Sequence, residues 1–308
     1  MLFLRNKKRM IIVISFVLIG LSVFLVFKEQ QLKNSLSDYQ IGLKQLFPST
    51  PPVITNTVYD KADVPREFSL IFTGDVIPAR MVNYTMERKN DFTYPFASTS
   101  AFLKDASLTV INLEAPLIKN CPVSQEGMVF CGNQKFVEGL KMADIDVVAL
   151  ANNHILNYES NGLKETVDLL NKNKIDTVGI GSILYKKIKN IKLAFVNYND
   201  ILPRDENVAV LDEDKIKKDI IEAKRNSDYV VAMFHWGKEY SYQPLSDAPV
   251  ALRDPIKIAH LAIDNGADLV VGNHPHTIQG YEKYKDKYIF YALGNFIFDQ
   301  MWSEQTRI

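Results

Sequence analysis

The chain has 308 residues, with 36 Lys and Arg against 36 Asp and Glu, so its formal net charge at pH 7 is zero. Acidic and basic residues are interleaved, which leaves no basic face and argues against a nucleic-acid partner. A hydrophobic content of 47% is enough for a full core, and the length suits one large domain or two small ones.

The N-terminus predicts a membrane anchor. Residues 1–9 are basic and precede an uncharged apolar run, residues 10–27. At about 1.5 Å per residue, this run crosses nearly all of the roughly 30 Å hydrocarbon layer. A cleaved signal peptide is the alternative, but the run ends in Val26-Phe27-Lys28 and not in a small-residue cleavage site. We expect a single-pass protein of the cell membrane, with residues 1–9 cytoplasmic and the main domain extracellular.

Residues 28–66 predict a stalk and a linker. A polar stretch with scattered Leu and Ile, residues 28–47, is consistent with a short helix. The Pro-rich segment that follows at residues 48–52 cannot continue a helix, and no period holds after it. The folded domain is therefore expected over residues 67–308.

Within this domain, apolar runs predict strands that alternate with helices. The expected strands span residues 68–75, 108–113, 146–151, 192–198, 229–234, 269–271 and 288–293. The expected helices span residues 95–105, 134–143, 162–174, 213–226 and 249–265. This order predicts an α/β domain with helices on both faces of a sheet.

The two cysteines, Cys121 and Cys131, bracket a short polar loop. An extracellular domain lies in an oxidising compartment, where such a pair favours a local disulfide. Two unrelated thiols are the alternative. A metal role is disfavoured because no His or second Cys pair lies beside them.

Polar side chains follow the apolar runs in a regular order. These side chains are Asp75, Glu114, Asn153, His235, His274 and His276. Each has an ordinary explanation when taken alone, such as a helix cap, a solvated loop residue or a core histidine. Together they would converge on one edge of the sheet, where mixed oxygen and nitrogen ligands suit Mn, Fe or Zn. The alternate positions of His274 and His276 predict that both rings point the same way, whereas His260 is expected to have no role at the site.

The motifs around these residues resemble a known family. They are Thr73-Gly74-Asp75, Asn112-Leu113-Glu114-Ala115-Pro116, Ala151-Asn152-Asn153-His154, Phe234-His235-Trp236-Gly237-Lys238-Glu239-Tyr240, His274-Pro275-His276 and Leu293-Gly294-Asn295-Phe296. The series resembles the CapA/PgsA family of poly-γ-glutamate capsule biosynthesis proteins. That family is similar to calcineurin-like metallophosphoesterases, and the resemblance covers about residues 67 to 303.

The resemblance implies a four-layer α/β/β/α sandwich of the metallophosphoesterase type around two divalent metal ions. Asp75 would bind one ion, and Glu114 would bridge both. Asn153 and His235 would bind the other ion, and the ligand pair His274 and His276 would divide between them. Such a centre would activate water and stabilise charge on an attacked oxygen.

His154 would lie near the leaving group, as a general acid or as a donor to the transition state. Two departures argue against ordinary phosphatase activity. Ile77 occupies the place of the imidazole in the Asp-x-His motif of metallophosphoesterases, and Glu114 replaces their bridging aspartate. Relatives continue with more strands, so we expect the chain to be C-terminally truncated.

A second group of residues would bind substrate. Its members are Arg80, Trp236, Lys238, Glu239 and Asn295. An ordinary surface position explains the first four equally well.

The expected function is capsule polymer biosynthesis by a membrane-anchored, metal-dependent hydrolase. The expected partners are an anionic polymer such as poly-γ-glutamate, the subunits of a membrane synthase, and the membrane itself. One alternative is a non-catalytic accessory subunit that binds polymer and synthase. Another is a general surface metallophosphoesterase.

Overall fold

The computed structural model describes residues 68–203 and 205–300. The predicted cytoplasmic segment, membrane anchor, stalk and linker lie outside these residues. Within the described part, none of the helices has the length and apolar character needed to cross a bilayer.

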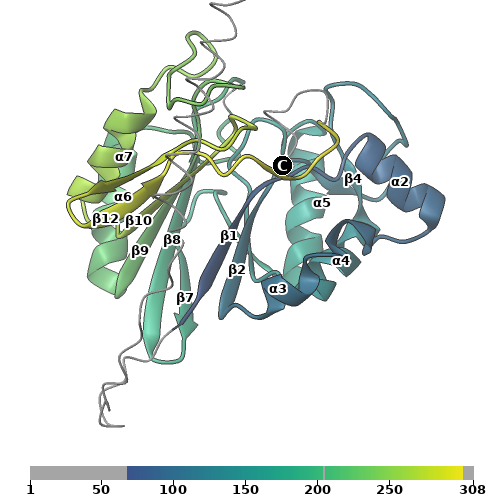
Figure 1. The fold of residues 1–308 in the computed structure, drawn as a ribbon, viewed down its shortest axis with the longest axis horizontal. Helices are drawn as coiled ribbons and strands as arrows, with labels where there is room; N and C mark the ends of the chain where they lie inside the picture. Colours follow the sequence, from purple (N-terminus) through teal and green to yellow (C-terminus); the bar gives the residue numbers. More distant parts are fainter. Residues whose placement is uncertain (1–67, 204, 301–308) are drawn as a thin grey trace, which may run out of the picture. The chain divides into compact units, whose positions relative to one another are not determined.

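Strands and helices alternate along the described chain (Figure 1). The strands are β1 (Leu70–Val76), β2 (Leu108–Leu113), β3 (Leu117–Ile118), β4 (Gly132–Asn133), β5 (Val147–Ala149), β6 (Asp176–Val178), β7 (Leu184–Ile188), β8 (Ile191–Asn199), β9 (Tyr229–His235), β10 (Leu269–Asn273), β11 (Tyr281–Tyr284), β12 (Lys287–Phe290) and β13 (Asn295–Ile297). The helices are α2 (Met81–Lys89), α3 (Ser100–Lys104), α4 (Val137–Met142), α5 (Glu159–Lys172), α6 (Glu213–Asn226) and α7 (Pro255–Asp264), with short 3₁₀ helices η1 (Tyr94–Phe96) and η2 (Gln134–Phe136).

The strands form two main sheets. The first has five strands in the order β13-β1-β2-β5-β6, and all its pairs are parallel. The second has six strands in the order β11-β12-β10-β9-β8-β7, with antiparallel pairs only at its two edges. Since parallel strands end together, each sheet presents the carboxyl ends of its central strands at one rim.

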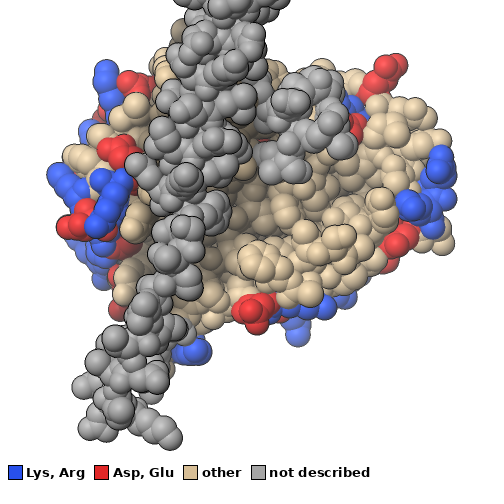
Figure 2. Space-filling view, in the orientation of Figure 1, with Lys and Arg blue, Asp and Glu red and all other residues tan. Residues whose placement is uncertain are grey.

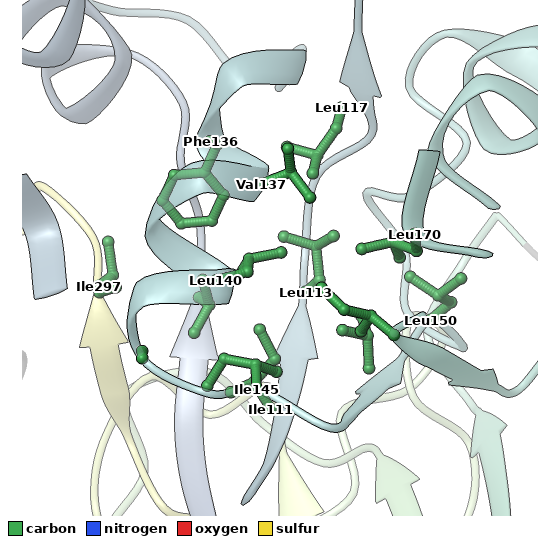
Figure 3. Packing of buried hydrophobic residues seen from close by; sticks show 14 of the residues in the cluster. Ile111, Leu113, Leu117, Phe136, Val137, Leu140, Ile145, Leu150, Leu170 and Ile297 are labelled. Atoms are coloured by element: carbon green, nitrogen blue, oxygen red, sulfur yellow. The ribbon is translucent and has the colours of Figure 1, made fainter. Parts of the chain in front are cut away.

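Three apolar clusters arrange these elements in layers (Figure 1). Leu108, Val147, Phe195 and Val231 belong to a cluster that joins the inner faces of the two sheets. A second cluster packs α3, α4 and α5 on the outer face of the first sheet (Figure 3). A third packs α6 and α7 on the outer face of the second sheet. The α/β class is confirmed, and the order of layers is helix, sheet, sheet, helix.

Three predicted elements differ from the structure. The helix expected over 95–105 is two short helices, η1 and α3, and the residues between them include Ser98 and Thr99, which are weaker helix formers than alanine. The helix expected from residue 249 begins at Pro255, where Asp254 caps it by accepting a hydrogen bond from the N–H of Ile256 at 2.9 Å.

The strand expected over 288–293 also differs. It ends at Phe290, and the chain then turns at Gly294, which has a φ of 70°. After this turn the chain enters the other sheet as β13, beside β1. A strand in each sheet replaces the single strand that the sequence predicts.

Charges of both signs lie side by side on the surface. Figure 2 shows Lys and Arg next to Asp and Glu near the edges of one face, over α7 and β12 on one side and α2 on the other. The visible centre of this face carries few charged side chains.

Candidate metal centre

The predicted ligands meet between the two sheets, and not at the edge of a single sheet as expected. Asp75 lies in β1, and Glu114 directly follows β2. His235 ends β9 in the second sheet, where it pairs in register with Asn273, the last residue of β10. His274 follows that strand end. The carboxyl ends of strands from both sheets therefore build the site.

The buried ligands form two groups that share Glu114. One group consists of Asp75, Glu114 and His235, and the other of Glu114, His274 and His276. Within each group the candidate ligand atoms lie within 4.8 Å of one another. A carboxylate common to both groups would be available to two ions if each group held one. Asp75 also lies close to the second group, since its Oδ2 is 3.2 Å from Nδ1 of His276.

Glu114 is the least satisfied residue of the site. It is 0% exposed, and neither carboxylate oxygen has a hydrogen-bond partner. Its Oε1 lies 3.4 Å from Nε2 of His235. Burial, and then the charge of Asp75, raise the pKa of Glu114 well above its usual value. Bare buried carboxylate oxygens beside imidazoles fit a divalent cation, which would satisfy both oxygens.

Asp75 has several partners. Its Oδ1 accepts a hydrogen bond from Nδ2 of Asn112 at 2.8 Å, and its Oδ2 accepts one from the backbone N–H of His274 at 3.3 Å. The Nδ1 of His276 lies 3.2 Å from the same Oδ2. Burial acts to raise the pKa of Asp75, but its contact with His276 outweighs this effect and lowers the pKa.

The three histidines differ in their surroundings. Burial lowers the pKa of His235 to about 3 and that of His274 well below its usual value, so both rings are neutral. Burial also acts to lower the pKa of His276, but the charge of Glu114 and the contact with Asp75 raise it to about 9. Neutral imidazole is the form that binds metal.

His274 and His276 are brought together, but not by strand alternation. Strand β10 ends at Asn273, and the two histidines have φ angles of 100° and 54°. These values lie in the left-handed region, which non-glycine residues seldom adopt. Both rings nevertheless converge on Glu114, and their centroids lie 5.9 Å apart.

The motif Asn152-Asn153-His154 lies at the rim of the site. Oδ1 of Asn153 lies 2.9 Å from Nε2 of His235. The Nδ1 of His154 lies 2.9 Å from Oδ1 of Asn157, and its ring packs on Phe130 with centroids 4.2 Å apart. Burial lowers the pKa of His154 to about 4, so this imidazole is uncharged at neutral pH.

Two asparagines that were not singled out orient the ligands. Asn112 donates to Asp75 through Nδ2, and its own Oδ1 accepts a hydrogen bond from Asn152 at 3.1 Å. Asn152 also donates to the carbonyl of Leu113 at 2.8 Å. Both belong to motifs quoted above. The only sequence signal for their orienting role is position, since Asn112 lies two residues before Glu114 and Asn152 lies one residue before Asn153.

The predicted substrate-binding residues occupy different environments. Trp236 is 1% exposed and stacks on Phe234 in the core, so it does not line a groove. Its indole N–H donates a hydrogen bond to the carbonyl of Tyr291. Lys238 is exposed, with Nζ 3.8 Å from Asp247. Glu239 is partly buried, and its charge acts to raise the pKa of Glu114.

Arg80 and Asn295 lie close to the site residues. The Arg80 guanidinium pairs with Asp299 and lies over the ring of Phe298, 4.6 Å from its centroid. Oδ1 of Asn295 lies 2.9 Å from Nδ1 of His276. Asn295 thus contacts a predicted ligand directly.

Ile77 lies in an apolar environment. It is fully buried, in a cluster with Ala79, Ala115 and Phe130. The position that carries an imidazole in the Asp-x-His motif therefore supplies no metal ligand in this chain.

Cys121 and Cys131 form a disulfide, with their Cα atoms 5.8 Å apart.

A cavity of about 310 Å³ is lined in part by Asn153 and Asn157. Pro203, Asp205 and other polar loop residues complete its lining.

Comparison with known proteins identifies the family. Residues 69–300 match the family described as bacterial capsule synthesis protein PGA_cap. The chain belongs to this family. Its membership confirms the resemblance to the CapA/PgsA proteins.

Individual relatives extend this result. The capsule biosynthesis protein CapA of Bacillus anthracis is 30% identical over 260 residues, which cover 77% of this chain and 61% of the relative. The PGA biosynthesis protein CapA of Bacillus subtilis (strain 168) is 28% identical over 307 residues, which cover 91% and 79%. A probable polyglutamine synthesis accessory protein of Mycobacterium tuberculosis is 26% identical over 255 residues, which cover 74% and 65%. The chain thus spans less than two thirds of the length of the Bacillus anthracis protein.

Similarity to solved structures is weaker. A novel phosphatase from Mycoplasma pneumoniae shares 15% identity, with 74% of this chain and 72% of that chain covered and a TM-score of 0.49. An overlap of this extent establishes neither a common fold nor a common activity.

Proposed function

We propose that this member of the capsule synthesis family is a membrane-anchored, extracellular protein of poly-γ-glutamate synthesis, with two divalent metal ions for hydrolytic or transfer chemistry. The proposal of metal binding rests mainly on Glu114. Its buried carboxylate oxygens lack hydrogen-bond partners, and the residue belongs to both ligand groups. Family membership supports the role in capsule synthesis. The anchor rests on the sequence of residues 10–27.

Six residues would hold the ions. They are Asp75, Glu114, Asn153, His235, His274 and His276. Mn, Fe and Zn suit this mixture of carboxylate, amide and imidazole ligands. When bound, such ions supply a water of lowered pKa and positive charge beside an attacked amide or phosphoester oxygen. We further propose that the four-layer sandwich has the metallophosphoesterase fold.

The residues of the chain itself would orient the reactants. His154 lies beside the proposed ligand Asn153 at the rim of the site, where it would exchange a proton with the leaving group. Lys238 is exposed and would attract the carboxylates of an anionic polymer. A membrane synthase would deliver this polymer to the site.

A non-catalytic accessory subunit is the second candidate. The buried Ile77 favours it, because the site lacks one imidazole of the Asp-x-His motif. The Mycobacterium tuberculosis relative is itself named an accessory protein. In this case the domain would bind polymer and synthase without cleaving a bond.

Metal content tests the site. Elemental analysis of the purified full-length chain should find about one to two Mn, Fe or Zn ions per chain. The Glu114→Ala variant should lose most of this metal, whereas His260→Ala should keep it, because His260 contacts Glu282 outside both ligand groups. A folded wild-type chain without metal would refute the proposed site.

Polymer production separates the two candidates. In a strain that depends on this chain, Glu114→Ala and His154→Ala should each lower polymer production strongly, and His260→Ala should not. If both site variants sustain full production, the chemistry is absent and the accessory role is correct.

A further inference from the structure

We infer that Phe130 and Asn157 position the imidazole of His154 and fix the nitrogen that carries its proton, and that the disulfide between Cys121 and Cys131 holds this assembly together. The inference rests on the proposed role of His154. Phe130 and Asn157 contact His154 directly, and neither they nor the two cysteines belong to either ligand group.

The first observation is a shared acceptor. Oδ1 of Asn157 accepts a hydrogen bond from the backbone N–H of Phe130 at 2.7 Å and lies 2.9 Å from Nδ1 of His154. A backbone N–H can only donate, so the Asn157 atom that faces it is the oxygen. This oxygen has no proton to give, so the Nδ1 of His154 must donate. Nδ1 therefore carries a proton whatever the charge of the ring, which leaves Nε2 as the nitrogen that would exchange a proton with the leaving group.

The second observation is the packing of the Phe130 ring. It lies against the His154 imidazole, with centroids 4.2 Å apart and an interplanar angle of 30°. The Arg80 guanidinium lies 5.2 Å from the centroid of the same ring, and the Phe298 centroid lies 5.7 Å away. Phe130 is buried among these neighbours, so its ring and backbone together fix both the plane of the imidazole and its hydrogen bond.

The third observation is the loop that delivers Phe130. Residues 122–129 are exposed, and the chain becomes buried only at Phe130 and Cys131. On the far side, the N–H of Gly132 donates to the carbonyl of Pro116 at 2.9 Å. On the near side, the disulfide fastens the start of the exposed loop to its end. The covalent link limits the conformations that the loop can adopt before Phe130.

NMR spectroscopy shows directly which ring nitrogen of His154 carries the proton. Full-length, metal-free protein with ¹⁵N-labelled histidine gives an NMR signal that distinguishes the two neutral forms of each ring. Wild type should show His154 protonated on Nδ1. Asn157→Ala should lose this preference and give a mixture, whereas Asn157→Asp keeps an acceptor and should retain the proton on Nδ1. His260, whose partner is Glu282, is the internal control and should be unchanged in all variants.

A second set of variants tests the role of the disulfide that closes residues 121–131. Reduction of the wild-type disulfide, or the double change Cys121→Ser and Cys131→Ser, should also shift part of the His154 population away from the Nδ1 form. Val129→Ala changes an exposed neighbour in the same loop and should have no effect. An unchanged His154 signal after reduction, with the His260 signal intact, would refute the role of the disulfide.

The result is separable from the proposed metal chemistry. Asn157→Ala should keep the metal content of wild type and still lower polymer production, because it acts through His154. A wild-type His154 protonated on Nε2, or an unaltered signal in Asn157→Ala, would overturn the inference whatever the metal content. A chain without metal would instead refute the proposed function and leave the assignment of the proton standing.

Discussion

Glu114 is the residue where burial and charge are most strongly opposed. Its carboxylate lies in the interior without a hydrogen bond, which costs free energy unless a proton or a cation compensates it. Burial raises its pKa, so the metal-free chain loses stability as pH rises above the unfolded pKa of about 4.3. A bound cation would remove this penalty.

Replacement of Glu114 by the isosteric amide glutamine tests the free-energy cost of its buried carboxylate. In metal-free protein at pH 7, Glu114→Gln should raise the free energy of unfolding by about 1–3 kcal/mol, because no buried charge remains. The gain should shrink towards pH 4, where the wild-type carboxyl is protonated in both states. Added Mn²⁺ should stabilise wild type but not the variant.

Urea unfolding with and without metal measures both effects. Glu138→Gln, at an exposed position of α4, is the control and should change neither quantity. Equal stabilisation of wild type and Glu114→Gln by Mn²⁺ would contradict a ligand role for this carboxylate.

The convergence of the candidate ligands was predictable because each lies at or after a recognisable apolar run, as Glu114 follows β2. The supporting residues were not predictable from their spacing. The contact between Asn157 and the N–H of Phe130 joins residues 27 positions apart, across a loop whose path depends on tertiary packing. Similarly, left-handed backbone brings His274 and His276 together, which a simple alternating pattern does not reveal.

At the scale of elements, Asp268 joins three parts of the second sheet layer. It lies between α7 and β10, and its carboxylate contacts Nζ of Lys224 in α6 at 2.8 Å and Nζ of Lys287 in β12 at 2.7 Å. It also accepts a hydrogen bond from the N–H of Val230 in β9 at 2.9 Å. Burial acts to raise its pKa, but the hydrogen bonds from Lys224, Lys287 and Val230 outweigh this effect and lower it.

Removal of this charge should weaken the layer. We expect Asp268→Asn to lower the free energy of unfolding at pH 7 by about 1–2 kcal/mol, because charge-assisted hydrogen bonds are lost from a half-buried site. Because the folded pKa is lowered, the stabilisation is present above the unfolded pKa of about 3.9 and is lost as pH falls through the folded value. The difference between wild type and variant should therefore shrink below pH 4.

Unfolding curves at several pH values check this expectation. Asp286→Asn removes a carboxylate that is 92% exposed and pairs with Lys283, so it should leave stability nearly unchanged. A difference for Asp268→Asn that does not depend on pH would contradict the electrostatic explanation.

The central elements were predictable, and the edges were not. Helix α6 has the predicted bounds, because Asp212 caps its start through the N–H of Lys215 and its apolar residues recur at helical spacing. Strands β6 and β13 have only three residues each, which is too short to show a period. Strand β7 carries Lys186 and Lys187, as edge strands often do, and lacks a strong apolar run. The division of the strands between two sheets is therefore not visible in the apolar pattern, and only the family resemblance implied it.

At the scale of the whole molecule, the metal centre depends on how the two sheets pack. Asp75 and Glu114 come from one sheet, and His235 and His274 from the other. The apolar cluster between the sheets includes Phe195, which is fully buried. Packing in this layer therefore sets the distance between the two sets of ligands.

A cavity in this layer should affect both stability and metal. Phe195→Ala should lower the free energy of unfolding by about 3–5 kcal/mol, as for other buried phenylalanines. It should also weaken metal binding, because the sheets lose part of their common core. Phe102→Ala, at a side chain that is 69% exposed, is the matched control and should have little effect on either.

Urea unfolding and metal titration of the full-length variants measure the two effects. If Phe195→Ala loses stability but binds metal as tightly as wild type, then the inter-sheet core does not set the ligand geometry.

The pairing of β1 with β13 has a consequence for biosynthesis. Asp75 lies in register with Asn295, so the first strand of the described residues has the last described strand as its neighbour. A ribosome releases β1 first, and one side of β1 must wait until more than 200 further residues have been made. During this interval an unpaired strand is open to association with other chains. This side of the sheet, which carries Asp75 of the candidate metal centre, can therefore be completed only after residue 295 has been made.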